Sequence, residues 1–218
     1  MQIPSKARAV IIGGGVIGCS IAYHLGKLGW KDVVLLERKQ LTCGTTWHAA
    51  GLIAQLRATQ NMTRLAKYSQ ELYFGLEAET GVATGFKRNG SITVALTDER
   101  MEELRRSAAM ARAFGVEIDE ITPGDIAGRY PGLATGDVVG GVWLPKDGQA
   151  DPVNITQALA KGARTFGVSI LLGVKVTSIH PANGRVRGVD SDFGPLEAAC
   201  VVNAVGVWGR GLVFCAGC

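Results

Sequence analysis

The sequence has no apolar run of the roughly 20 residues that a membrane-spanning helix needs. It also has no large excess of one charge, because 23 Lys and Arg stand against 19 Asp and Glu, and the net charge of +4 gives no basis for a nucleic-acid-binding surface. Its five cysteines are an odd number without framework spacing, so a disulfide-stapled scaffold is not expected. We therefore expect neither a membrane span nor a nucleic-acid partner.

A cleavable leader is also not expected, because residues 1–8 run straight into an apolar strand and a glycine motif. This pattern favours a cytoplasmic protein. Hydrophobic residues make up 47% of the 218 residues, which is enough for a domain with a real core. The 30 glycines follow no three-residue period, which excludes a collagen-like chain and indicates many tight turns.

The first forty residues predict a strand, a helix and a second strand around a glycine-rich turn. Residues 7–12 form a short β-branched run that is typical of a buried parallel strand. A G-x-G-x-x-G motif follows at once and leads into residues 19–28, which have helical spacing. Residues 32–36 (DVVLL) then predict a second buried strand. This order is that of a dinucleotide-binding βαβ unit.

Each residue of the motif has a physical role in such a unit. Gly13 permits the tight turn, Gly15 lets the backbone approach a pyrophosphate, and Gly18 lets the helix pack closely on the strand. The amides near Val16 and Ile17 are expected to face the phosphates at the positive end of the helix dipole.

Glu37 lies 19 residues after Gly18, where its carboxylate would accept hydrogen bonds from ribose hydroxyls. Its charge argues against a 2′-phosphorylated nucleotide, although the adjacent Arg38 leaves that point open. The motif alone does not distinguish NAD from FAD. Residues 37–52 favour FAD, because they are rich in small and hydroxyl side chains where a nicotinamide domain would have its next βα unit. Such a loop can wrap a flat ligand with polar edges.

Residues 37–52, ERKQLTCGTTWHAAGL, resemble the glycine-oxidase and D-amino-acid-oxidase superfamily of flavoproteins. The similarity is closest to its group of dimethylglycine dehydrogenases, dimethylglycine oxidases and sarcosine dehydrogenases. The TWHAAG core is specific, and the resemblance extends to about Trp208. Supportive stretches occur at residues 57–73, 84–91, 148–152 and 201–208.

The resemblance implies an FAD cofactor. It places a backbone contact to the adenine at Val176 and sets the turn at Gly206 beside the flavin pyrophosphate. Together with the glycine motif, it implies that the cofactor-binding residues are Gly13, Gly15, Val16, Ile17, Gly18, Glu37, Arg38, Thr45, Thr46, His48, Gly51, Leu52, Val176 and Gly206.

In this family the histidine of the motif is bonded covalently to the 8α-methyl group of FAD, and the matching residue is His48. A neutral imidazole nitrogen is a suitable nucleophile for that bond. The alternative is that His48 only makes a local hydrogen bond or points into solvent. His24 and His180 have no such context and are interpreted as structural or exposed.

The implied fold class is α/β, a Rossmann-like FAD-binding domain with an inserted α+β portion of a substrate domain, truncated at the C-terminus. We expect residues 1–82 to form the first part of the FAD-binding domain and residues 83–150 a partial substrate-binding layer. Residues 151–208 return to the FAD-binding domain, and residues 209–218 are an atypical tail.

Periodicity and turn signals predict the remaining elements. The helix at residues 61–80 is expected to bury a face formed by Leu65, Tyr68, Leu72 and Leu76. Further helices are expected at residues 98–114, from a cap at Thr122, and from a cap at Asp151 to about Phe166. Further strands are expected at residues 92–96, 138–144, 168–172, 174–179, 185–191 and 200–205, the last of them buried.

The family reaction is the oxidation of an N-methyl group on a glycine-derived amine, such as dimethylglycine or sarcosine, by hydride transfer to the flavin. An electron-acceptor protein or oxygen would reoxidise it. Phe86, Tyr130 and Trp143 are candidates for the wall of an amine site, with core packing as the alternative. In the family the residues that touch the amine lie mostly beyond residue 218, so we predict no catalytic residue, and no metal site is expected.

Residues 209–218 depart from the family, which continues for several hundred further residues. Cys215 and Cys218 form a C-x-x-C that lacks the helix start of a redox motif and the two further ligands of a zinc site. We interpret this segment as a truncation or a shifted reading frame, with a short redox tail as the alternative. Two other functional hypotheses stay open: a catalytically inactive FAD-binding relic, and one subunit of a split amine oxidase.

Overall fold

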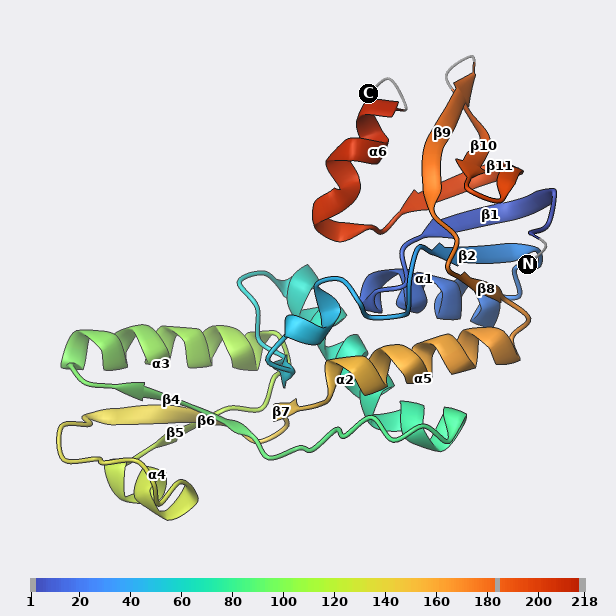
Figure 1. Cartoon of the computed structure of the whole chain (residues 1–218). Helices are drawn as coiled ribbons and strands as arrows, with labels where there is room; N and C mark the ends of the chain where they lie inside the picture. The colour runs from blue at the N-terminus through green and yellow to red at the C-terminus, as the bar shows by residue number, and fades with distance from the viewer. Residues whose placement is uncertain (1–2, 183–184, 216–218) are drawn as a thin grey trace. The chain divides into compact units, whose positions relative to one another are not determined.

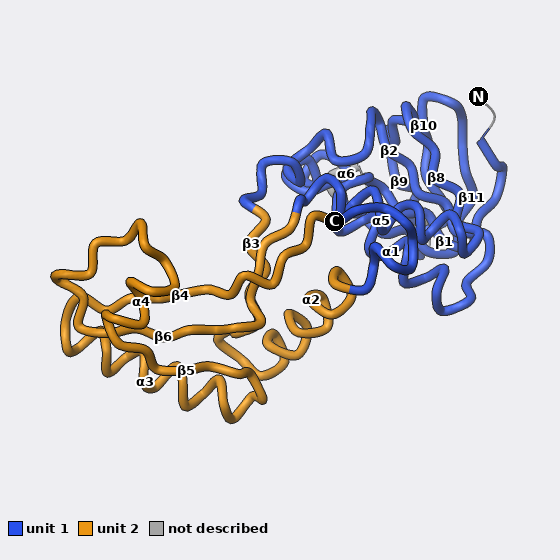
Figure 2. The backbone as a smooth tube through the Cα atoms, turned by 90° about the horizontal axis from the view of Figure 1, so that it is seen from below, with its two compact units in different colours: residues 1–50, 75–84, 151–218 blue, residues 51–74, 85–150 orange. Residues whose placement is uncertain are grey.

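The computed structural model describes residues 3–182 and 185–215, and the chain divides into two compact units, which Figure 2 colours separately. Unit 1 consists of residues 1–50, 75–84 and 151–218, and unit 2 of residues 51–74 and 85–150. The sequence predicted two FAD-binding parts, at residues 1–82 and 151–208, on either side of an insert at residues 83–150. Unit 2 also takes residues 51–74, which the sequence assigned to the first FAD-binding part.

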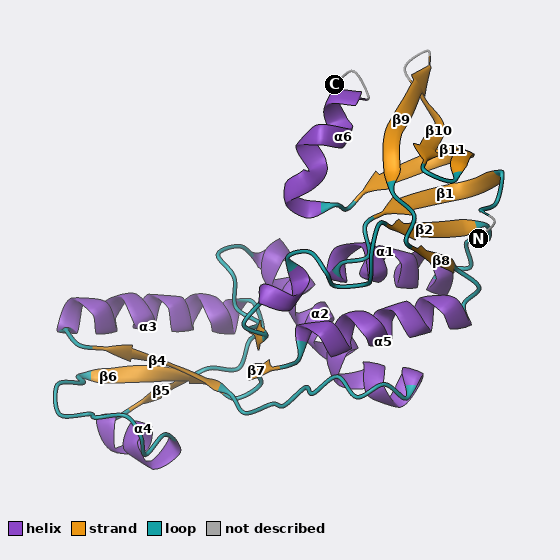
Figure 3. Ribbon diagram, in the orientation of Figure 1, coloured by secondary structure: helices purple, strands orange, loops and turns teal. Residues whose placement is uncertain are grey.

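Unit 1 is built on one six-stranded sheet (Figure 1). Four neighbouring strands are parallel, and the last two run antiparallel to their neighbours. Helices α1 (Val16–Lys27) and α5 (Pro152–Thr165) lie side by side along the sheet (Figure 3). The strand order is β8 (Ser169–Leu172), β2 (Val33–Glu37), β1 (Lys6–Ile12), β11 (Gly194–Asn203), β10 (Arg185–Ser191) and β9 (Val176–Ala182).

The contact between α1 and α5 depends on two glycines. A Cβ added at Gly26 would lie 2.7 Å from the Cβ of Phe166, and one added at Gly162 would lie 2.8 Å from the ring of Tyr23. These glycines let the two helices approach each other closely enough to bury Tyr23 completely. Asp151 begins α5 as predicted, because its carboxylate accepts the amides of the next turn at 2.8 and 3.0 Å.

Unit 2 contains an antiparallel sheet of β4 (Ser91–Ala95), β6 (Gly140–Leu144) and β5 (Asp119–Ile121). Helix α3 (Asp98–Ala113) packs Met101, Leu104, Ala108 and Ala111 against that sheet. Helix α4 (Pro123–Arg129) begins with the predicted cap, since Thr122 and Asp125 form a reciprocal capping box. A short pair of strands, β3 (Leu52–Ile53) and β7 (Gly148–Gln149), and most of α2 (Gln60–Thr80) complete the unit.

The predicted apolar face of α2 is wrong in its first half. Leu65 and Tyr68 are 58% and 47% exposed, whereas Thr63 and Gln70 are buried. The amide of Gln70 accepts a hydrogen bond from Nε2 of Gln55 at 2.6 Å and donates one to the carbonyl of Lys146 at 2.5 Å. Polar partners from distant loops therefore decide which face of the helix is buried, and a hydropathy pattern does not contain them.

The prediction of a buried strand at residues 200–205 is also wrong, because Cys200 and Asn203 are exposed. Strand β11 pairs with β1 as far as Asn203, but β10 pairs with β11 only from Gly194 to Glu197. The second half of β11 therefore has one partner strand among the described residues.

The segment that the sequence set apart as a tail continues unit 1. A short 3-10 turn, η2 (Gly206–Trp208), leads into α6 (Gly209–Cys215), and Leu212 packs against the core of the sheet. Cys218 of the C-x-x-C lies outside the described residues. Within the part of the chain that the structure describes, no helix is both long and apolar enough to cross a membrane.

Candidate functional site

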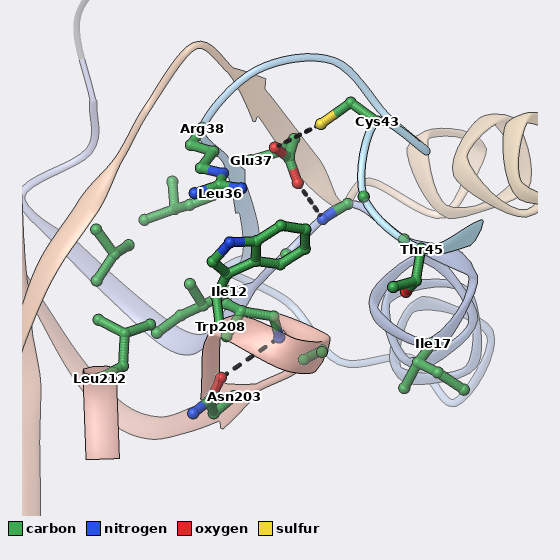
Figure 4. Close-up of a pocket in the computed structure, with 18 of the residues that line it drawn as sticks. Ile12, Ile17, Leu36, Glu37, Arg38, Cys43, Thr45, Asn203, Trp208 and Leu212 are labelled. Atoms are coloured by element: carbon green, nitrogen blue, oxygen red, sulfur yellow. Dashed lines mark hydrogen bonds between the residues drawn. The ribbon is translucent and has the colours of Figure 1, made fainter. Parts of the chain in front are cut away.

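Unit 1 carries a pocket of about 820 Å³ at the carboxyl ends of β1, β2 and β11 (Figure 4). Its walls come from the glycine-rich turn after β1, the loop after β2, the start of β9 and the segment from Asn203 to Leu212. The carboxyl edge of a parallel sheet is where open α/β folds bind their ligands. The pocket size is within the range of small-molecule and cofactor sites.

The structure gives a steric reason why each of the three motif positions is a glycine. Gly13 has a φ of +109°, and a Cβ there would lie 2.6 Å from the carbonyl oxygen of Ala204. A Cβ at Gly18 would lie 1.9 Å from the carbonyl oxygen of Gly13, and one at Gly15 would lie 3.0 Å from Oγ1 of Thr46. The turn is therefore formed by close backbone approaches that side chains would prevent.

The first turn of α1 differs from the sequence prediction at the amide of Val16, which was expected to face a phosphate. The amide of Val16 donates to Oγ1 of the buried Thr46 at 3.0 Å, so a hydroxyl of the chain itself occupies this donor. The amides of Gly15 and Ile17 donate to no described residue. These two amides at the positive end of a 12-residue helix are suited to an anion such as a pyrophosphate.

Glu37 is 8% exposed and stands at the end of β2, within the pocket wall. Its Oε2 accepts the amide of Gly14 at 2.7 Å, and its Oε1 accepts the amide of Lys39 at 2.9 Å and the thiol of Cys43 at 3.6 Å. Figure 4 shows the first and last of these bonds. An ionised carboxylate has about four acceptor positions, so one remains for a ribose hydroxyl.

Arg38 and Trp208 form a further wall of the pocket. The guanidinium Cζ of Arg38 lies 4.4 Å from the centroid of the indole ring. On the Gly44 side the indole is close to the loop, since a Cβ at Gly44 would lie 3.2 Å from its Cζ3 atom. Sequence reasoning did not select Trp208 as a site residue, although its place just after the carboxyl end of β11 is a signal for one.

The pocket brings together ten of the residues that the sequence selected, namely Gly13, Gly15, Val16, Ile17, Glu37, Arg38, Thr45, Thr46, Val176 and Gly206. Gly18 lies behind the turn in α1. His48 does not line the pocket, but it ends the 3-10 turn η1 (Thr46–His48) and lies in sequence between Thr46 and Ala49, which do line it.

Gly51 and Leu52 belong to unit 2 and do not line this pocket. Gly51 has a φ of +76°, and its carbonyl accepts the amide of Ala150 at 2.9 Å. Leu52 is 76% exposed at the start of β3.

Sequence reasoning also missed several lining residues that come from strand ends. Lys175 and Thr177 flank the selected Val176, Asn203 ends β11, and Cys43 donates to Glu37. Their common signal is a position close to a predicted strand or to a selected residue.

The three aromatic residues proposed for an amine site have other neighbours in unit 2. Phe86 makes an edge contact with Phe74 at 6.1 Å between ring centroids, and Arg129 lies 4.8 Å from the ring centroid of Trp143. Tyr130 is 60% exposed.

The other two histidines lie away from the pocket. His24 is in α1, where Nδ1 is 2.7 Å from the carbonyl of Ser20. His180 in β9 is 45% exposed and lies 2.5 Å from Oδ2 of Asp190. Among residues 3–182 and 185–215, no cluster of three His, Cys, Asp or Glu side chains is arranged to hold a metal ion.

The residues present fit the ADP half of a dinucleotide. The backbone cradle at Gly15 leaves room for a pyrophosphate, and the Glu37 carboxylate lines the pocket at the end of β2, where dinucleotide-binding folds have an acidic residue. Apolar side chains, among them Ile12, Leu36 and Val174, complete the wall.

The chain is similar to longer curated proteins. It is 38% identical over 212 residues to the mitochondrial sarcosine dehydrogenase of Homo sapiens, covering 94% of this chain and 23% of the relative. It is 41% identical over 205 residues to the mitochondrial dimethylglycine dehydrogenase of Rattus norvegicus, covering 94% and 24%. It is 38% identical over 208 residues to the mitochondrial pyruvate dehydrogenase phosphatase regulatory subunit of Mus musculus, covering 95% and 24%. The chain spans about a quarter of the length of these relatives.

Among solved structures, the L-proline dehydrogenase from P. horikoshii superposes with a TM-score of 0.93 at 31% identity. The superposition covers 99% of this chain and 57% of that one. The profile of the FAD dependent oxidoreductases known as DAO matches residues 8–216, which includes most of the segment set apart as a tail. The chain therefore belongs to the DAO family of FAD-dependent oxidoreductases.

Proposed function

We propose that the protein oxidises the N-methyl group of a small glycine-derived amine, such as sarcosine or dimethylglycine, with FAD bound in the pocket of unit 1. The observation that carries this proposal is the pocket itself, with its glycine cradle, its helix amides and the carboxylate of Glu37. The relatives named for sarcosine and dimethylglycine support the substrate class, because both amines carry an N-methyl group beside a carboxymethyl group.

The residues of the pocket would bind and orient the cofactor. The amides of Gly15 and Ile17 would donate to the pyrophosphate, and Glu37 would accept a hydroxyl of the adenosine ribose. The guanidinium of Arg38 would add a positive charge at the same rim. FAD, when bound, supplies an acceptor for a hydride at its N5 atom.

The overall reaction balances without a metal. With FAD bound as the hydride acceptor, the N-methyl carbon would lose a hydride and become the carbon of an iminium ion. Water adds to that carbon and releases formaldehyde and the demethylated amine, or tetrahydrofolate takes the one-carbon unit. An electron-acceptor protein or oxygen then takes the two electrons. The electron acceptor is identified by a separate measurement from the one that follows oxidation of the substrate.

We further propose that His48 attaches the flavin covalently. The supporting observations are the TWHAAG motif and the position of His48 one residue before Ala49, which lines the pocket. The imidazole nitrogen would supply the electron pair of a new bond to the 8α carbon, while one C–H bond and the imidazole N–H bond break. The two protons and two electrons released by this bond formation would pass to dioxygen and give hydrogen peroxide.

A second candidate function is that of a non-catalytic FAD-binding protein. The relative named as a regulatory subunit favours it, because that protein is as similar to this chain as the dehydrogenases are. A third candidate is one subunit of a split amine oxidase, which a partner chain would complete. All three candidates share the cofactor pocket and differ in whether an amine reduces the flavin.

Anaerobic mixing of the full-length protein with sarcosine, dimethylglycine and glycine separates the candidates. The proposal expects the two methylated amines to bleach the oxidised flavin, whereas glycine, which has no N-methyl group, leaves it oxidised. Flavin that is bound but reduced by none of the three favours the non-catalytic candidate. Reduction by glycine at a rate equal to that by sarcosine would contradict oxidation at the N-methyl group.

A further inference from the structure

The turn that carries His48 is fixed to the pocket through the side chain of Thr46. Thr46 is buried, and its hydroxyl holds the amide of Val16 at the start of α1. Within the turn, the amide of His48 donates to the carbonyl of Thr45 at 3.2 Å, and the amide of Ala49 donates to the carbonyl of Thr46 at 3.2 Å. The backbone of His48 therefore has a defined position relative to the phosphate-binding end of α1.

The imidazole of His48 stacks on a neighbouring indole. Neither ring nitrogen makes a hydrogen bond to a residue that the structure describes, and the side chain is exposed. Its ring lies 3.8 Å from the indole of Trp47, centroid to centroid, with 33° between the planes. The indole is therefore the described contact that restrains the rotation of the imidazole.

Core packing does not explain this indole. Trp47 is 55% exposed, although a large apolar side chain is ordinarily buried. Since the stack covers one face of the imidazole, both ring edges, where the two nitrogens lie, stay open. A nucleophile that is held with its lone pair accessible reacts faster than one that rotates freely, because the orientational entropy is lost before the reaction.

We propose that Trp47 is a positioning residue that holds the imidazole of His48 for bond formation with the 8α carbon of the flavin. This inference rests on the proposed covalent attachment and adds the residue that makes it efficient. The size of an aromatic pair interaction corresponds to about a threefold to tenfold slower attachment when the stack is lost. The affinity for FAD before the bond forms does not depend on the stack.

The test follows attachment over time in the full-length protein, prepared without flavin and mixed with saturating FAD. The flavin that stays with acid-precipitated protein measures the covalent product, and an equilibrium titration measures non-covalent binding. Trp47→Leu keeps an apolar side chain but removes the aromatic face, while Trp47→Phe keeps an aromatic face. Trp30→Leu is the control, because Trp30 lies outside the pocket and its ring centroid is 3.9 Å from Cζ of Arg8.

The inference expects Trp47→Leu to attach flavin about three to ten times more slowly, with unchanged affinity for FAD, and Trp47→Phe and Trp30→Leu to behave as the unsubstituted protein. Equal attachment rates in all four proteins would overturn the role of Trp47 and leave the covalent link intact. Slower attachment that follows weaker FAD affinity, and recovers at higher FAD concentration, would also overturn it. If the unsubstituted protein retains no flavin after acid precipitation, the link through His48 itself fails.

Discussion

The guanidinium of Arg38 lies over the indole of Trp208, with 4.4 Å from Cζ to the ring centroid. Arg38 follows β2, and Trp208 ends the turn η2 that follows β11, so the pair joins the loop after β2 to the last pocket-forming segment of unit 1. A cation over an indole stabilises such a contact by about 0.5 to 2 kcal/mol, depending on how far water is excluded. The pair therefore stabilises one wall of the pocket as well as lining it.

We predict that Arg38→Ala and Trp208→Ala each weaken FAD binding by about threefold to tenfold. The double variant should have nearly the same FAD dissociation constant as the single variant that binds FAD less tightly. The physical reason is that each side chain holds the other in place, so their losses are not additive. Quenching of flavin fluorescence during an equilibrium titration measures the dissociation constants.

The control for this pair is Arg8→Ala. Arg8 lies 3.9 Å from the ring centroid of Trp30, so it has the same kind of contact outside the pocket. Its loss should leave the FAD dissociation constant unchanged. Fully additive effects of the Arg38 and Trp208 substitutions would contradict a coupled wall.

Gly18→Ala should prevent FAD binding and destabilise unit 1. The added methyl group would lie 1.9 Å from the carbonyl oxygen of Gly13, which is backbone and cannot rotate away, so α1 must shift from the strand. Overpacking of this kind costs about 1 to 3 kcal/mol. Chemical denaturation and FAD titration of the variant measure the two effects.

Gly75→Ala provides the matched control for that substitution. Gly75 also lies inside a helix, α2, but an added Cβ there meets no atom within 4 Å. The methyl group should stabilise the helix by up to about 1 kcal/mol through helix propensity alone. If both variants lose the same stability, the loss does not come from the contact with Gly13.

The first βαβ unit was predictable from the sequence because its signals are local. A β-branched run, three spaced glycines and a helical period place β1, α1 and β2 within a few residues of their observed bounds. The caps at Thr122 and Asp151 are likewise local, since each side chain bonds to amides two or three residues away. Helix α2 was placed correctly along the chain, but its buried face depends on Gln55 and Lys146, which only the tertiary fold brings near.

The candidate site divides in the same way. The glycine turn and Glu37 follow from the spacing rules of a dinucleotide-binding unit. The bond from Val16 to Thr46 and the contact of Arg38 with Trp208 join residues 30 or more positions apart, and no spacing rule predicts them. The sequence therefore identified the kind of site, while the structure identifies which side chains form its walls.

The reactivity of the cysteines with N-ethylmaleimide tests whether FAD binds in this pocket. Cys43 is exposed, lines the pocket and donates to Glu37, so FAD should protect it from the reagent. Cys200 is exposed outside that pocket and should react equally with and without FAD. Burial raises the pKa of Cys19 to about 12, so its thiol should stay protonated and unmodified at neutral pH.

Peptide mapping by mass spectrometry gives the modified fraction at each cysteine separately. Cys43→Ser should remove the FAD-protected signal and leave that of Cys200 unchanged. Equal modification of Cys43 in the presence and absence of saturating FAD would contradict the placement of the cofactor against this loop.

The carboxylate of Asp190 gives a prediction about pH. The hydrogen bond from His180, and then the one from Ser178, lowers the pKa of Asp190 below its ordinary value. A carboxyl group whose pKa is lower in the folded state stabilises that state above its unfolded pKa, near 3.9, and this contribution is lost as the pH falls through the folded pKa. Asp190→Asn should therefore lower the midpoint of thermal unfolding at about pH 5.5, and this difference should shrink as the pH falls below the unfolded pKa. Ser178→Ala, which removes only the hydrogen bond from Ser178, should lower the midpoint of unfolding by less at the higher pH. A decrease for Asp190→Asn that persists unchanged at low pH would show that it does not come from the ionised carboxylate.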